Sequence, residues 1–99
     1  MYARLTTTAV PASTEPFSVG AVVEHVLPTL RELDGFRGLL VLSAVDGSSV
    51  VSLSLWESAE AMAASEDVSQ KMRAAETASR GLRAPEAAAF KVDALRLNP

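Results

Sequence analysis

The stretch from residue 36 to residue 57 reads FRGLLVLSAVDGSSVVSLSLWE. It contains two apolar runs, 36–46 and 49–57, on either side of Asp46-Gly47. This dipeptide tolerates the positive φ angles of a tight turn, so the pattern predicts an antiparallel hairpin. In the first run both alternating sets of side chains are apolar, which is typical of a strand whose two faces are both covered.

The second run has two unlike faces, because side chains alternate along a strand. One set is apolar: Val51, Leu53 and Leu55. The other is mixed: Val50, Ser52, Ser54 and Trp56. We interpret the mixed set, with its small polar side chains, as the lining of a cavity on the face of the sheet away from the helices.

On the N-terminal side, residues 2–10 are rich in β-branched and aromatic types, and they predict a strand that ends at Pro11. Thr14 is the expected cap of a helix that runs to about Asp34, with Pro16 in its first turn and a kink at Pro28. Its buried stripe has helical spacing and consists of Val19, Val22, Val23, Val26, Leu27, Leu30 and Leu33.

On the C-terminal side, Ser58 is the expected cap of a helix over 59–80. Residues 65–67 allow a break and restart within it, and Gly81 ends it. Its expected inner face consists of Ala61, Ser65, Val68, Met72 and Ala75. Residues 88–97 then predict a fourth strand.

This order of elements, βαββαβ, predicts an α+β, ferredoxin-like fold with a four-stranded antiparallel sheet and two helices on one face. The helix-free face would then expose apolar side chains in an isolated chain, and a patch of that size usually marks an interface. We therefore expect a homodimer that packs through the helix-free sheet face.

Composition narrows the classes of function. The 99 residues fit a single domain, 1–99. A net charge of −3 gives no reason to expect nucleic-acid binding, and no apolar run approaches the length of a membrane span, so a cytoplasmic protein is expected. The absence of Cys and the single His leave no metal-ligand cluster, so we expect no metal site.

Two motifs carry a resemblance to a known family. Residues 33–38, LDGFRG, and residues 54–61, SLWESAEA, resemble the dimeric α/β-barrel superfamily, and most closely its antibiotic biosynthesis monooxygenase (ABM)-like branch. The resemblance implies a dimer and a lumen that binds small organic molecules. Some relatives oxidise polycyclic aromatic phenols with oxygen and without metal or flavin, so no cofactor is expected.

Other relatives degrade haem, and these should carry an Asn on the first strand, a Trp at the end of the third strand and a His on the second helix. Only the Trp is present here, as Trp56. The first strand, residues 2–10, contains no Asn, and residues 59–80 contain no His. Without the axial ligand, haem degradation is not expected.

The candidate ligand-binding residues share one predicted sheet face. Trp56 could stack on an aromatic ligand, or it could be a core or interface residue at the strand end. Ser52 and Ser54 could donate hydrogen bonds to a ligand, or they could simply fill a tapering barrel. Thr6 and Tyr2 lie on the corresponding face of the first strand, together with Thr8.

Two weaker candidates could take part in catalysis. Arg4 could hold a phenolate or carboxylate with its fork of donors, although an Arg near a chain end more often reaches solvent or a surface acid. His25, the only imidazole of the chain, is the natural candidate for proton transfer, but it lies on the flank of the helix stripe, where a partly exposed His beside an acid is the simpler expectation. The acids of the second helix, Glu60, Glu66, Asp67 and Glu76, have the scatter of a solvated face.

Two functional hypotheses follow. The first is a cofactor-independent monooxygenase, or a related small-molecule enzyme, that acts on an aromatic or polyketide-like compound in the lumen. The second is a non-catalytic dimeric module that binds a small ligand or has a structural role. The absence of an evident general base keeps the second hypothesis open.

Overall fold

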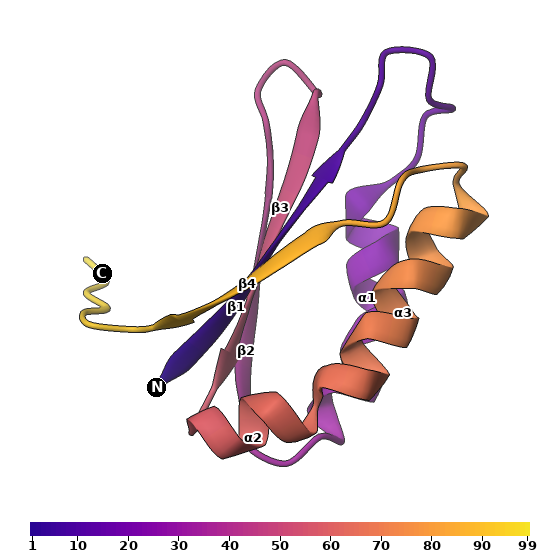
Figure 1. The fold of residues 1–99 in the computed structure, drawn as a ribbon. Helices are drawn as coiled ribbons and strands as arrows, with labels where there is room; N and C mark the ends of the chain where they lie inside the picture. The colour runs from indigo at the N-terminus through magenta and orange to yellow at the C-terminus, as the bar shows by residue number, and fades with distance from the viewer.

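The computed structural model describes residues 1–99. Its elements are, in chain order, β1 (Tyr2–Ala9), α1 (Val19–Arg31), β2 (Phe36–Ser43), β3 (Ser49–Trp56), α2 (Ala59–Ala64), α3 (Glu66–Ser79) and β4 (Glu86–Lys91). The strands form one sheet in the order β2-β3-β1-β4, and every neighbouring pair is antiparallel. Figure 1 shows α1 and α3 side by side on one side of this sheet. The predicted ferredoxin-like fold is confirmed.

The hairpin between β2 and β3 is also confirmed. The turn closes through a hydrogen bond from Gly47 N to Ala44 O (2.9 Å), and Gly47 has a φ of 76°. Only glycine adopts such an angle readily, which explains the Asp46-Gly47 pair. The Asp46 carboxylate adds a side-chain contact, because it accepts a hydrogen bond from Ser48 N at 2.9 Å.

The mixed set of β3 side chains lies on the helix-covered face of the sheet, and not on the opposite face expected from the sequence. Thr6 pairs with Ser52 and Arg4 with Ser54, so the mixed set of β3 shares its face with the polar side chains of β1. These residues line a pocket together with residues of α1 and α3, which places the mixed face under the helices. The apolar set is therefore on the bare face. Strand alternation separates two faces, but it does not say which one the helices cover.

The start of α1 differs from the expectation. Ser18, and not Thr14, is the N-cap, and its side chain accepts a hydrogen bond from Ala21 N at 3.1 Å. The ring of Pro16 holds Glu15 away from helical angles, so Thr14 cannot cap a helix that continues through this proline. Pro28 lies inside α1, as expected.

The second half of the chain bears out one expectation and corrects two others. The helix breaks at Ser65 into α2 and α3, within the range where a break was predicted. Val68 and Ala75, placed on the inner face from sequence, are exposed, while Ser65 and Ser69 are buried. The fourth strand is 86–91 rather than 88–97, and it pairs with β1 from Glu86 opposite Thr7 to Lys91 opposite Tyr2.

The core lies at the end of the sheet where β3 meets α2. Trp56 is fully buried there and packs with Leu30 and Met62. The ring of Phe36 meets the Trp56 ring edge to face, with 5.5 Å between centroids. Polar residues make up much of the remaining buried set: Arg4, Thr6, Ser54, Ser65, Ser69 and Thr77. No helix combines the length and the apolar character that crossing a membrane requires.

Candidate functional site

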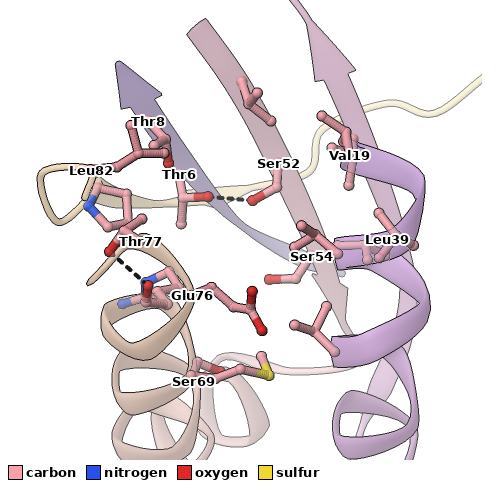
Figure 2. A pocket seen from close by; sticks show the side chains of 18 of the residues that line it. Thr6, Thr8, Val19, Leu39, Ser52, Ser54, Ser69, Glu76, Thr77 and Leu82 are labelled. Carbon is pink, nitrogen blue, oxygen red and sulfur yellow. Dashed lines mark hydrogen bonds between the residues drawn. The ribbon is translucent and has the colours of Figure 1, made fainter. Parts of the chain in front are cut away.

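A pocket of about 160 Å³ lies between the sheet and the helices α1 and α3. Figure 2 shows side chains from both layers pointing into it. Its wall on the α1 side is apolar and consists of Phe17, Val19, Val22, Val23, Val26 and Leu30. The α3 side is mostly polar or charged and includes Ser69, Arg73, Glu76, Thr77 and Arg80. An apolar pocket with a few placed polar groups is typical of small-molecule sites.

The floor of the pocket is a strip of hydroxyl groups on the sheet. Thr6 and Ser52 lie opposite each other on β1 and β3, and their hydroxyls are hydrogen bonded (Figure 2). Ser54 accepts a hydrogen bond from Trp56 Nε1 at 2.9 Å, which leaves its own hydroxyl proton free to be donated. The floor can therefore both donate to and accept from the polar edge of a ligand.

Arg4, which lies opposite Ser54 in the sheet, also lines the pocket and is only 5% exposed. Its Nη1 donates to Ser69 Oγ (3.0 Å), and its Nη2 donates to Met62 O (2.7 Å) and to Ser65 Oγ (3.2 Å). Its charge is balanced by Glu66, with 2.8 Å between Nη2 and Oε2.

The environment of Arg4 has opposing effects on its charge. Burial lowers the pKa of Arg4, and the nearby positive charge of Arg73 lowers this pKa too, while Glu66 raises it. An arginine remains charged under all these influences. The pocket lining therefore includes a buried, charged guanidinium that is paired with Glu66.

The α3 side carries a second charged group. Glu76 projects from α3 toward the space between the two layers (Figure 2). Its Oε1 lies 3.3 Å from His25 Nε2 on α1, and its Oε2 lies 3.6 Å from Arg80 Nη2. The Arg80 guanidinium also lies over the Phe17 ring, 5.2 Å from its centroid. These contacts join α3 to α1 and to the segment that precedes it.

The residues predicted from sequence are distributed as follows. Arg4, Thr6, Thr8, Ser52 and Ser54 line the pocket together. Trp56 and Tyr2 do not line it: Trp56 is in the core, as in the alternative considered for it, and Tyr2 packs against that core.

The other two expectations concern Arg4 and His25. His25 also lies outside the lining, and its side chain is 77% exposed beside Glu76. This is the exposed histidine near an acid that its helical position indicated. Arg4 is buried rather than directed at solvent, and it reaches the partly exposed acid Glu66, as one of the simpler expectations for it allowed.

Sequence reasoning missed Glu76 and Arg73 as pocket residues. A signal existed, because Ser65, Ser69, Met72 and Glu76 follow one another at intervals of three or four residues, as one face of a helix does. A search for apolar residues at helical spacing does not find this stripe, because three of its four members are polar. In the structure no group of three or more His, Asp or Glu side chains is placed to hold a metal ion.

Comparisons with known proteins give likeness in structure only. No family model and no curated protein sequence matches the chain. Among solved structures, a monooxygenase from Streptomyces coelicolor in complex with nanaomycin D has a TM-score of 0.71 and 22% identity, covering 99% of this chain and 92% of that chain. SnoaB, a cofactor-independent oxygenase from Streptomyces nogalater, has a TM-score of 0.69 and 19% identity, covering 95% of this chain and 94% of that chain.

The haem degrader MhuD from Mycobacterium tuberculosis, with two haems bound, has a TM-score of 0.67 and 22% identity, covering 99% of this chain and 100% of that chain. The chain thus has the fold of the ABM-like proteins, as the resemblance of residues 33–38 and 54–61 implied. Identities this low establish the shared fold, and function has to be argued from the pocket itself.

Proposed function

We propose that the pocket between the sheet and α1 and α3 binds a flat aromatic molecule with polar substituents along one edge. The observation that carries this proposal is the opposition of two unlike walls. The valines of α1 offer an apolar surface to a ring face or edge, and the hydroxyls of Thr6, Ser52 and Ser54 offer hydrogen bonds on the other side. Such a division orients a ligand as well as binding it.

The reaction we propose is cofactor-independent monooxygenation of that ligand. Two structural neighbours are a monooxygenase and a cofactor-independent oxygenase by name, which supports the class of chemistry. Without a cofactor, the electrons that reduce oxygen must come from the substrate. An electron-rich phenol with an acidic ring CH₂ meets this need: the CH₂ becomes a carbonyl with one oxygen atom, and the other oxygen atom leaves as water.

Arg4 has an electrostatic role in this proposal. Its guanidinium is held by Ser69, Ser65 and a backbone carbonyl, so it stays in place whether or not a ligand is bound. Glu66 offsets part of its charge, but a positive group held in a partly dry site stabilises a nearby anion more than the same group does in water. Arg4 would therefore favour the deprotonated substrate, which is the form that reacts with oxygen.

Oxygen uptake with 1,8-dihydroxyanthrone tests the proposal. We expect the protein to accelerate uptake above the rate in buffer, and Val22→Phe, which fills the pocket from α1, to remove most of the acceleration. Ala21→Phe is the matched control, because Ala21 is exposed and does not line the pocket. Uptake that is no faster than in buffer, or that survives Val22→Phe unchanged, would overturn the oxygenase proposal.

A non-catalytic binding module is the alternative, and one observation favours it. The Arg4 guanidinium already has protein partners at both terminal nitrogens, so Arg4 offers a ligand few uncommitted donors. Equilibrium dialysis of the anthrone under nitrogen separates the two functions. A binding module would bind the anthrone, lose this binding in Val22→Phe, and fail to accelerate oxygen uptake above the rate in buffer.

We also propose a homodimer through the bare face of the sheet. Leu40, Leu42 and Phe90 are each about half exposed there (51%, 48% and 51%). Leu40 lies opposite Leu53, and Phe90 opposite Ala3, so the exposed side chains are part of one continuous apolar surface. Burial against a second copy would remove this surface from water.

A further inference from the structure

Glu76 is the one carboxylate among the residues that line the pocket. The other charged members of the lining are Arg4, Arg73 and Arg80. Glu66 is close by, but it does not line this pocket, and its two oxygens lie 2.8 Å from Arg4 and 3.0 Å from Arg73. Among the acids of the chain, Glu76 is therefore the one that a bound ligand can reach.

The contacts of Glu76 leave it able to accept a further hydrogen bond. Its oxygens lie 3.3 Å from His25 and 3.6 Å from Arg80, which are longer than the 2.7–2.9 Å usual for charge-assisted hydrogen bonds. The side chain is 20% exposed, so it is neither locked into an ion pair nor freely solvated. These are the properties expected of a group that takes and releases a proton.

His25 connects this carboxylate to solvent. Its side chain is 77% exposed, while its Nε2 faces Glu76 Oε1. Imidazole both accepts and releases protons near neutral pH. The pair thus joins an acceptor at the pocket to an exit on the outer surface of α1.

We infer that Glu76 is the general base that removes the ring CH₂ proton of an anthrone-type phenolic substrate, and that His25 passes this proton to solvent. The inference rests on the proposed function and names a base for it. The C–H bond breaks, the proton binds a Glu76 oxygen, and the electron pair stays on the ligand as a delocalised phenolate-like anion. Glu76 then gives the proton to His25 Nε2, and a proton leaves the imidazole for water.

The three arginines of the lining suit this step. Proton transfer neutralises Glu76, so the new negative charge on the ligand faces three arginines, of which Arg4 and Arg73 are paired with Glu66 and Arg80 is released from Glu76. The attraction between opposite charges is several times stronger in a partly buried site than in water. The lining therefore stabilises the anion that the base creates.

Hydrogen exchange under nitrogen isolates the proton step from oxygen chemistry. We would incubate 1,8-dihydroxyanthrone in D₂O with the protein and follow deuterium at its ring CH₂ by mass spectrometry. We expect the protein to accelerate exchange, and Glu76→Gln to reduce this acceleration by roughly 10²-fold, the lower range for loss of a general base. Glu76→Asp should restore part of it.

Controls separate a chemical role from a structural one. Glu60→Gln changes an exposed acid on α2 that lies outside the pocket, and it should exchange as the parent does. Melting temperature and anthrone binding by dialysis are measured for each variant. Exchange by Glu76→Gln at the parental rate, with binding intact, would overturn the assignment of the base.

The remaining outcomes are equally decisive. Oxygen uptake by the parent protein without accelerated exchange would remove the inference and leave the proposed function standing, whereas failure to bind the anthrone would remove both. His25→Gln should slow deuterium entry severalfold, because the route to solvent is lost. Unchanged exchange in His25→Gln would show that Glu76 exchanges its proton with water directly.

Discussion

Arg4 organises the polar layer beneath the helices. It reaches from β1 to the break between α2 and α3, where Ser65 and Ser69 accept hydrogen bonds from its guanidinium. The guanidinium also lies 5.6 Å from the centre of the Trp56 ring. A buried charge is costly unless it is paired and hydrogen bonded. The pairing explains why serines, rather than apolar residues, occupy the inner face at the helix break.

Gly35 and Gly47 offer a matched test of backbone strain. Both have positive φ angles, 79° and 76°, but a Cβ at position 35 would lie 2.5 Å from the Ala61 Cβ, whereas position 47 has open space. We expect Gly47→Ala to lower the free energy of unfolding by about 1 kcal/mol, from the left-handed backbone alone. Gly35→Ala should cost roughly 1–3 kcal/mol more, because the turn has to move away from α2.

Urea denaturation at one fixed protein concentration measures both free energies. Val45→Ala, at the exposed tip of the hairpin, controls for mutation of that turn. Equal losses at positions 35 and 47 would mean that the close approach of Gly35 to α2 does not constrain the fold.

At the scale of elements, the sequence predicted the order of the elements, the pairing of the two hairpin strands and roughly where the segments end. The hairpin was clear because turn chemistry and two apolar runs agree at Asp46-Gly47. The limits of β4 were not predictable from its own residues, since they depend on its register with β1. The mixed set does line a cavity, as interpreted, but the sheet faces were assigned the wrong way round because this cavity lies under the helices.

For the pocket, the β1 and β3 members were predictable and the α3 members were not. Alternation along a strand places Thr6, Ser52 and Ser54 on one face whatever covers it. Whether Glu76 faces the pocket or solvent depends on how far α3 is rotated about its axis, and that rotation depends on the break at Ser65. Long-range packing of this kind leaves little trace in local sequence.

The hairpin turn predicts a pH dependence of stability. Hydrogen bonds from the Ser48 side chain and backbone N–H lower the pKa of Asp46 below its ordinary value of 3.8. A carboxyl group with a lowered pKa in the folded state stabilises the fold above the unfolded-state pKa, and this contribution is lost as pH falls through the folded-state pKa. Asp46 therefore stabilises the protein at neutral pH and stops doing so in acid, below about pH 4.

Asp46→Asn keeps the shape of the turn and removes the titration. We expect its unfolding free energy to fall less steeply than that of the parent between pH 5 and pH 2, as followed by urea denaturation at each pH. Asp93→Asn, in the exposed tail after β4, is the control and should keep the parental slope. Identical slopes for Asp46→Asn and the parent would show that the turn contributes nothing to acid sensitivity.

At the scale of the whole molecule, the two faces of the sheet are covered unequally. The sheet has helices on one side only, and on the other side the tail beyond β4 leads away from it (Figure 1). Leu95 and Leu97 in this tail are exposed, in addition to the apolar side chains of the bare face. A second copy related by a two-fold axis would cover the bare face of both chains at once.

The proposed dimer should depend on Leu40 more than on any residue of the helix side. A glutamate at position 40 would be buried without a partner at the sheet-to-sheet contact. The free energy needed to bury an unpaired charge exceeds the free energy gained from the remaining apolar contacts. We therefore expect the parent chain to have twice the 10.4 kDa mass of one copy by light scattering after size exclusion, and Leu40→Glu to have the mass of one copy. Val68→Glu, on the exposed side of α3, should remain dimeric. A parent chain that is monomeric at micromolar concentration would show that the bare face is stable in water, and the dimer proposal would then be wrong.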